Sequence, residues 1–200
     1  ITVGCNASGT IYGGNNPPYC ESWPEMVVRY LQDKYHVELE VSNTAIGGTT
    51  TRQGVDRFGK DVLSYAPDLL IIGYGMNDPG TSLEEYKGMI GQMIGRYRQK
   101  VGNGNVILIS PMLPNVETNW CVLQPQFEKV LEELAQENDF CALAPMTSLH
   151  REILKSGKRY RDMTGNNVNH PNDFIVRVYA QAVLTALLGN EFLEDFASEE

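Results

Sequence analysis

The stretch that most constrains the fold of this chain is DLLIIGYGMND, residues 68–78. Residues 69–72 form a short, wholly apolar run without alternation, which is typical of a strand buried on both faces in a parallel sheet between helices. The run opens onto the turn Gly73-Tyr74-Gly75, and Asn77 and Asp78 come shortly after. Ligands of open α/β sheets bind beyond the carboxyl ends of the strands, so we expect a functional site at this turn.

Helical and strand patterns alternate along most of the remaining chain. We expect helices over 21–35, 52–65, 83–100, 124–138, 148–155 and 173–188, and strands over 37–42, 106–110 and 140–143. Strands that alternate with helices of this length predict a parallel sheet with helices on both sides. Only four strands are visible, and a long loop and a helix precede them. We therefore expect about five strands, with the first one upstream of Ile1.

The size and charge of the chain narrow its class. Its 200 residues are 42% hydrophobic and 20% charged, which predicts one domain over residues 1–190 with an acidic tail over 191–200. A formal net charge of −9 argues against nucleic acid and anionic membrane surfaces as partners. No apolar run is long enough to cross a membrane, so we expect no membrane insertion.

The residues that commonly hold metals and cofactors are not arranged to do so. The four cysteines form no C-x-x-C pair and the three histidines are widely separated, so we expect no metal site. Cys5 and Cys20 could form a disulfide or remain free thiols. A dinucleotide fingerprint starting at Gly73 would need a glycine where Asp78 stands, and that carboxylate would repel a pyrophosphate. We expect no cofactor.

Three turns carry polar or glycine residues that should meet at one edge of such a sheet: Gly47-Gly48, Gly75–Asp78 and Asn167–His170. Together they resemble blocks of the GDSL/SGNH hydrolase family of esterases and acylhydrolases. The resemblance implies a three-layer, flavodoxin-like α/β/α fold. It also implies that Gly48 and Asn77 donate hydrogen bonds to an oxyanion, and that His170, in the sequence HPND, is the catalytic base.

The position of the serine nucleophile is open between two registers of the family's first block, Gly-Asp-Ser-x-Thr-x-Gly. Ile1-Thr2-Val3-Gly4 fits the end of that block, which would place the nucleophile just before Ile1. We favour this register, since the first strand is also expected upstream of Ile1. In the second register the nucleophile is Ser8, which stands in Ser-x-Thr context but lacks the preceding Gly-Asp.

The family's usual Asp-x-x-His motif is altered, because Asn167 occupies the aspartate position. An amide cannot stabilise an imidazolium as a carboxylate does. A backbone carbonyl could orient His170, Asp162 or Asp173 could reach it, or the activity could be weak. We favour the carbonyl, because a fixed tautomer is enough for a dyad to work.

Side chains expected near the nucleophile favour a carbohydrate ester as substrate. Amide and phenol groups suit sugar hydroxyls and ring faces, and the candidates for substrate binding are Asn6, Tyr12, Tyr19 and Asn115. We therefore expect a serine esterase that hydrolyses small acyl esters, acetyl above all, on a carbohydrate or other small molecule. The alternatives are a lipid or aryl ester hydrolase of the same family, and a glycan-binding module with weakened catalysis.

Overall fold

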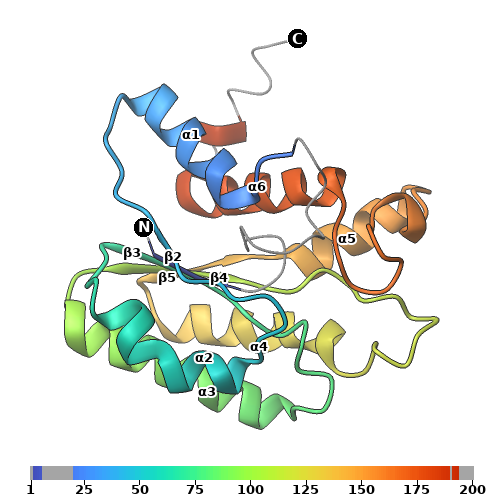
Figure 1. Ribbon diagram of the computed structural model, residues 1–200, viewed down its shortest axis with the longest axis horizontal. Helices are drawn as coiled ribbons and strands as arrows, with labels where there is room; N and C mark the ends of the chain where they lie inside the picture. The colour runs from blue at the N-terminus through green and yellow to red at the C-terminus, as the bar shows by residue number, and fades with distance from the viewer. Residues whose placement is uncertain (1, 6–19, 190, 194–200) are drawn as a thin grey trace.

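The computed structural model describes residues 2–5, 20–189 and 191–193 of the chain (Figure 1). Its centre is a five-stranded parallel sheet with the strand order β2-β1-β3-β4-β5. The strands are β1 (Thr2–Cys5), β2 (Ser42–Asn43), β3 (Leu69–Gly73), β4 (Asn105–Ile109) and β5 (Cys141–Ala144). The expected parallel α/β sheet is confirmed.

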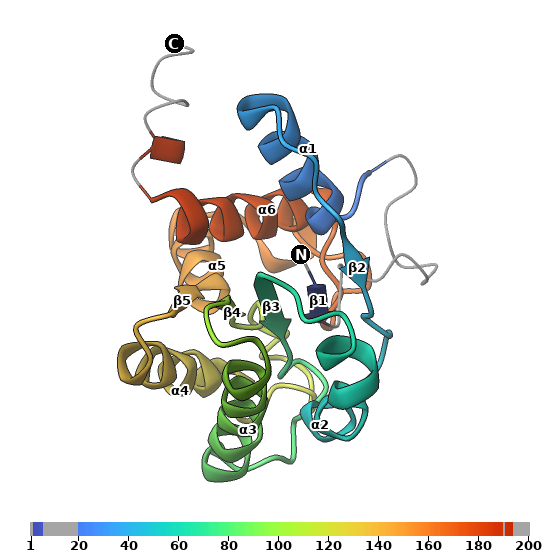
Figure 2. The same ribbon diagram turned by 90° about the vertical axis from the view of Figure 1, so that its left-hand side faces the viewer.

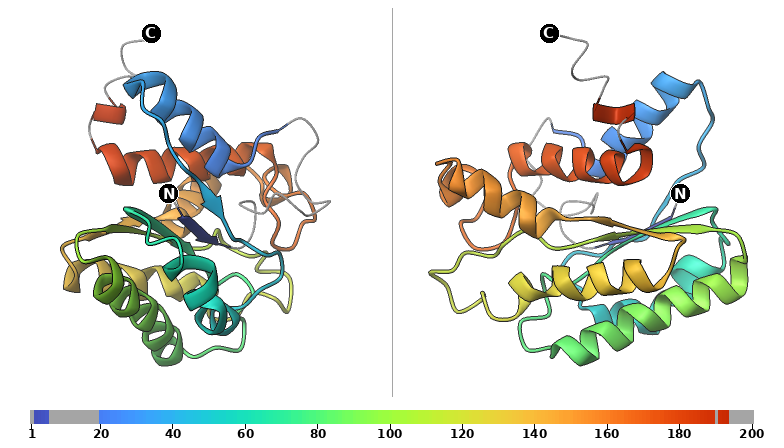
Figure 3. Two further views of the ribbon diagram at one scale, coloured as in Figure 1. Left: turned by 60° about the vertical axis from the view of Figure 1, so that its left-hand side comes forward. Right: turned by 180° about the vertical axis from the view of Figure 1, so that it is seen from behind.

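Helices cover both faces of the sheet and complete the expected three-layer sandwich. On one face lie α1 (Trp23–Tyr35), α5 (Met146–Lys155) and α6 (Asp173–Leu188). On the other lie α2 (Thr51–Phe58), α3 (Leu83–Val101) and α4 (Gln124–Glu137), as the end-on view shows (Figure 2). The views from the side and from behind show the same layers (Figure 3). None of the described helices is long and apolar enough to cross a membrane.

The apolar run over residues 69–72 lies in a strand that is buried on both faces of the sheet, as predicted. Ile71 packs into the core beneath α1 and α6, whereas Leu70 and Ile72 pack into the core beneath α2, α3 and α4. All three are at most 2% exposed. Alternate side chains of β4 divide in the same way between the two cores. Because neither face of this strand meets solvent, its sequence does not alternate between apolar and polar residues and is apolar throughout.

The prediction that the first strand lies upstream of Ile1 was wrong. β1 comprises Thr2–Cys5 and lies between β2 and β3, paired with both. A four-residue strand that contains a glycine is too short for periodicity to reveal it. Pairing with neighbours on both sides, and not intrinsic propensity, places these residues in the sheet.

Two other elements differ from the sequence-based boundaries. The strand expected over 37–42 is reduced to Ser42–Asn43, and Val37 and Val41 are 42% and 37% exposed. The alternating VELEVS pattern has no layer to pack on there, so it forms only a short edge strand. The helix expected over 52–65 changes after Phe58 into a π-helical segment, Gly59–Leu63.

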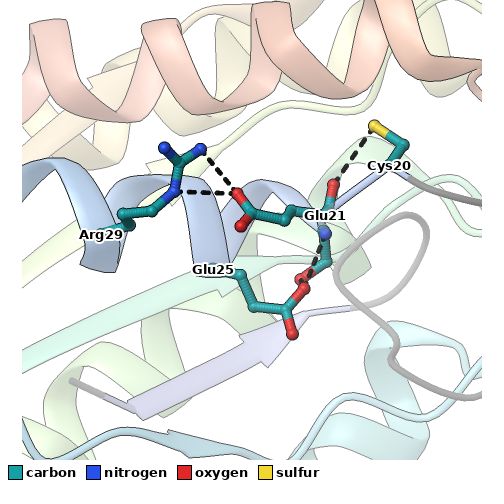
Figure 4. A network of polar contacts seen from close by, with 5 residues as sticks. Cys20, Glu21, Glu25 and Arg29 are labelled. Atoms are coloured by element: carbon teal, nitrogen blue, oxygen red, sulfur yellow. Dashed lines mark hydrogen bonds and ion pairs between the residues drawn. The ribbon is translucent and has the colours of Figure 1, made fainter.

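A network of polar contacts holds the start of α1 (Figure 4). Ser22 caps the helix, and its backbone N–H and hydroxyl both donate to Glu25 at 2.8 Å. Arg29 pairs with Glu21 at 2.7 Å, and the Cys20 thiol donates to the carbonyl of Glu21 (Figure 4). Cys20 is a free thiol, as are Cys121 and Cys141.

Candidate active site

The register of β1 against β3 determines which part of the first segment reaches the functional edge of the sheet. The two strands are parallel, and Cys5 lies opposite Gly73, two residues before Gly75. The chain therefore leaves β1 at the edge that carries the Gly75–Asp78 turn. A residue before Ile1 would lie at the other end of β1, about 13 Å or more away for four residues of strand. This geometry favours the second register, with Ser8, over the one that places the nucleophile before Ile1.

Four residues proposed for the site belong to the segment that follows β1. Ser8, Asn6, Tyr12 and Tyr19 lie outside the described residues. Ser8 is the third residue after Cys5, whereas Asn77 is the fourth after the end of β3 and Gly48 the fifth after the end of β2, so all three follow their strands closely in the sequence.

The turn after β3 is held from several sides. Gly75 has φ +121°, and a Cβ there would meet the ring of Phe127 at 3.0 Å and the hydroxyl of Tyr86 at 3.3 Å. Tyr86 donates its hydroxyl hydrogen to the carbonyl of Tyr74 at 3.0 Å. From the next loop, the indole N–H of Trp120 donates to the carbonyl of Met76 at 3.1 Å. Only glycine meets both the conformational and the steric demand at position 75.

The turns after β2 and β3 are joined by Asp78. Its carboxylate is 2% exposed and accepts hydrogen bonds from the backbone N–H of Thr51 at 3.0 Å and from the Thr51 hydroxyl at 2.9 Å. Burial raises the pKa of Asp78, and the bonds from Thr51 oppose that rise. Asn77 donates its side-chain amide to the carbonyl of Thr49 at 3.3 Å. These bonds hold the Asn77 turn against the turn that contains Gly48.

Gly48 and Asn77 therefore occupy neighbouring turns at one edge of the sheet. Gly48 has φ +78°, in the left-handed region that glycine tolerates best, and a Cβ on it would meet nothing within 4 Å. Because an amide group carries two N–H bonds, Asn77 keeps a second donor beside the one that binds Thr49. Backbone and side-chain donors on adjacent, fixed turns can stabilise a negative oxygen.

The third turn carries His170 on a loop held by asparagines. The side-chain oxygen of Asn166 accepts hydrogen bonds from the backbone N–H groups of Val168, Asn169 and His170, each at 3.0 Å. Asn167 has φ +57°, which places it in the left-handed region. Partial burial lowers the pKa of His170, so the imidazole is neutral over a wider pH range than a free histidine.

Neither aspartate considered as a partner for His170 fulfils that role. Asp162 accepts hydrogen bonds from Arg159 at 2.8 and 3.0 Å, and Asp173 lies in the first turn of α6. Within the described part of the chain, no side chain forms a hydrogen bond with the imidazole of His170. A backbone carbonyl as its orienting partner therefore stays a prediction.

Asn115 was predicted to bind substrate; in the structure it holds two loops together, and a role in substrate binding stays a prediction. Its side chain is 5% exposed and donates to the carbonyl of Asn167 at 2.8 Å, while its oxygen accepts from the backbone N–H of Glu117 at 3.0 Å. Its own backbone N–H donates to the carbonyl of Val168 at 2.8 Å. Asn115 thus attaches the His170 loop to the loop after β4. The side-chain N–H and oxygen that form these bonds are therefore used within the protein.

His150 was not predicted from the sequence to take part in the site, and it supports the loop after β4 and, through Tyr160, the His170 loop. His150 is fully buried in α5, and its Nδ1 accepts the backbone N–H of Leu113 at 3.1 Å. Its ring stacks on Tyr160 at 5.5 Å, and the Tyr160 hydroxyl lies 3.0 Å from the carbonyl of Leu113 and 2.9 Å from that of Val168. Burial lowers the pKa of His150 to about 4, so it is neutral at pH 7. Its place on the apolar face of the helix was the available signal.

A groove of about 400 Å³ adjoins the His170 loop. It is formed by the loop after β4, the end of α5 and the segment around Tyr160, and Asn167 closes one side. The residues that line it are Leu113, Pro114, Asn115, Val116, Glu117, Leu154, Arg159, Tyr160, Arg161 and Asn167.

Among the described residues, no group of three or more His, Cys, Asp or Glu side chains is placed to hold a metal ion.

The role assigned to Asn115 leads to a prediction. We expect Asn115→Ala to lower kcat about tenfold or more and to leave KM nearly unchanged, because a poorly placed catalytic group slows the reaction step. It should also lower the free energy of unfolding by about 1–3 kcal/mol, since buried backbone partners lose their bonds. Steady-state kinetics and urea unfolding measure both quantities. Asn138→Ala is the matched control, because it removes a hydrogen bond from a side-chain amide to the carbonyl of Leu134 at the C-terminal end of α4. A raised KM with unchanged kcat would instead indicate substrate binding.

Comparison with known proteins identifies the family of this chain. A family model for the GDSL-like lipase/acylhydrolase family matches residues 1–175. Comparison with curated protein sequences returns no match.

Solved structures share the fold at low sequence identity. A variant of Axe2, an acetyl-xylooligosaccharide esterase from Geobacillus stearothermophilus, has a TM-score of 0.79 at 20% identity, covering 94% of this chain and 93% of that one. A protein described as a GDSL-like lipase, from Parabacteroides merdae, has a TM-score of 0.76 at 20% identity, covering 92% and 94%. The catalytic mutants of Axe2 among these structures replace a serine, an aspartate and a histidine.

Proposed function

Because this chain belongs to the GDSL-like lipase/acylhydrolase family and is a serine ester hydrolase, we propose that it removes acetyl groups from a carbohydrate, with Ser8 as nucleophile. The observation that best supports Ser8 is the register of β1. It brings the chain that leaves Cys5 to the edge of the sheet that carries Gly48 and Asn77. The family's first block requires a serine after the first strand, and Ser8 is followed by Gly9-Thr10 in the Ser-x-Thr pattern.

The reaction proceeds in two acyl-transfer steps. The Ser8 hydroxyl oxygen attacks the carbonyl carbon of the acetyl group, and His170 takes the hydroxyl proton. The tetrahedral intermediate collapses, the bond to the sugar oxygen breaks, and His170 gives its proton to that oxygen. Water then attacks the acetyl-enzyme with His170 again as base, which releases acetate and restores Ser8.

The tetrahedral intermediate of each step carries a negative oxygen that fixed donors must stabilise. We assign this role to the side-chain amide of Asn77 and the backbone N–H of Gly48. Both turns are held by hydrogen bonds that do not involve substrate, so the donors need little rearrangement during the reaction. Loss of one such donor typically costs about 10²–10³ in kcat.

A carbohydrate is favoured as the alcohol for two reasons. The Axe2 structures that share this fold are described as acetylxylan or acetyl-xylooligosaccharide esterases, and the segment after β1 is rich in amide and phenol side chains. The groove beside the His170 loop offers a mixed polar and apolar wall of the kind that sugars contact.

Comparing ester substrates tests the proposal. We expect acetate release from acetylated xylooligosaccharides and from 4-nitrophenyl acetate, with kcat/KM falling at least tenfold for 4-nitrophenyl octanoate. Ile46 and Val122 are 54% and 52% exposed in loops after β2 and β4, and they favour longer acyl chains as the second candidate. A preference for octanoate would therefore identify a lipid ester hydrolase. Glycan binding without any ester hydrolysis would identify a binding module.

A further inference from the structure

The groove beside the His170 loop carries two arginines, although the protein as a whole has a net charge of −9. We propose that this groove binds a carboxylate carried by the carbohydrate, so that the preferred substrate has a uronic acid close to the acetylated sugar. This inference rests on the proposed esterase function, since it concerns the substrate of that enzyme. Binding of the sugar can nevertheless be measured without catalysis.

The positive charge is concentrated in one short segment. Lys158, Arg159 and Arg161 stand within four residues, and together they lower the pKa of Asp162, through the hydrogen bond from Arg159 first and then through charge. Arg159 is partly neutralised, because it pairs with Asp162 at 2.8 Å. The Lys158 ammonium lies over the ring of Phe174, 4.3 Å from its centroid.

Arg161 is the cation of this segment best placed to meet a ligand, although its charge also acts on Asp162. It lines the groove and forms no ion pair with any residue in the described ranges. Glu117 is the carboxylate among the lining residues, against the two guanidinium groups of Arg159 and Arg161. A guanidinium matches a carboxylate with two parallel hydrogen bonds, which gives an anionic sugar an advantage over a neutral one.

The groove also has a fixed surface for a sugar ring. The Tyr160 hydroxyl is held at the carbonyls of Leu113 and Val168, which fixes the ring of Tyr160 beside Leu154 and Pro114 in the lining. An aromatic ring between an apolar wall and charged side chains suits the apolar face of a sugar and its charged substituent.

The groove lies within reach of the reacting centre. Asn167 lines it and precedes His170 by three residues, a span of at most about 11 Å along the backbone. A carbohydrate with its acetyl ester at His170 can therefore place a nearby sugar in the groove that Arg161 lines.

Calorimetry with unacetylated oligosaccharides tests the subsite directly. We expect wild-type protein to bind a xylotetraose with one glucuronic acid branch about tenfold more tightly than linear xylotetraose, as one exposed but well-paired carboxylate allows. Arg161→Ala should remove this preference, and 0.5 M salt should weaken it because exposed charges are screened. Lys100→Ala, which removes the same charge at the end of α3, should keep it. Equal affinities for the two sugars, or a preference that survives in Arg161→Ala, would overturn the proposal.

Kinetics separate this subsite from the esterase function. On acetylated glucuronoxylan, Arg161→Ala should raise KM severalfold at unchanged kcat, and its hydrolysis of 4-nitrophenyl acetate should equal that of wild type. If wild type hydrolyses no ester but still binds the acidic sugar selectively, the subsite stands and the esterase proposal fails. Faster hydrolysis of 4-nitrophenyl hemisuccinate than of the acetate would place the anion on the acyl group and would refute our assignment to the sugar.

Discussion

Replacing Ser8 by alanine should abolish ester hydrolysis, with a fall in kcat of about 10⁴–10⁶, as is typical when a serine hydrolase loses its nucleophile. The reason is chemical, because without the hydroxyl no acyl-enzyme forms and only the oxyanion donors and substrate binding still contribute. The expected residual rate over water is about 10³–10⁴, which these remaining groups supply. Acetate release from acetylated xylooligosaccharide and burst kinetics with 4-nitrophenyl acetate measure the loss.

A covalent label distinguishes a nucleophile from a residue that only supports the site. A fluorophosphonate should add one group per wild-type chain, and fragmentation of the labelled peptide should place it on Ser8. Ser64→Ala is the matched control, since the Ser64 hydroxyl is exposed and donates to the carbonyl of Lys60. Label on another residue, or full activity in Ser8→Ala, would refute the assignment of Ser8.

The sheet could be predicted from the sequence where its strands are buried on both faces. Residues 69–72 and 106–109 are continuous apolar runs, and both became central strands with side chains in two cores. β1 could not be predicted in the same way, since Thr2–Cys5 owes its place to pairing with β2 and β3. The missing first strand had also supported the placement of the nucleophile before Ile1, beside the match of Ile1-Thr2-Val3-Gly4 to the family's first block, and the observed β1 removes that support.

The site was predictable to the extent that its residues lie in short motifs. Gly48, Asn77 and His170 stand in such motifs, and the structure places Gly48 and Asn77 on turns that are bonded to each other. Asn115 could not be interpreted from sequence, since its role depends on contacts with Asn167 and Val168, more than fifty residues later in the chain. His150 poses the same difficulty, because only tertiary packing brings it to Leu113.

His170 should limit activity at acid pH, and His170→Ala should lower kcat about as much as Ser8→Ala, by roughly 10⁴–10⁶. A general base works only while it is unprotonated, so kcat/KM falls tenfold per pH unit below the pKa of His170. Burial lowers that pKa, so the fall should begin below the pH at which a free histidine titrates. The enzyme should therefore keep its activity into mildly acidic solution. A pH profile of kcat/KM on 4-nitrophenyl acetate measures this, with His36→Asn as a control on an exposed histidine.

The substitution Asn167→Asp tests whether residue 167 influences the pKa of His170. Asn167→Asp places a carboxylate where the family usually has one, and a negative charge near His170 favours its protonated form. We therefore expect the acid limb of the profile to move to higher pH in Asn167→Asp. We also expect kcat to rise above the wild-type value, because a carboxylate stabilises the imidazolium that forms in the transition state. The left-handed backbone at position 167 tolerates aspartate as it does asparagine, so the fold should be retained. An unchanged limb and an unchanged kcat would show that residue 167 does not act on His170, which would leave a backbone carbonyl as its orienting partner.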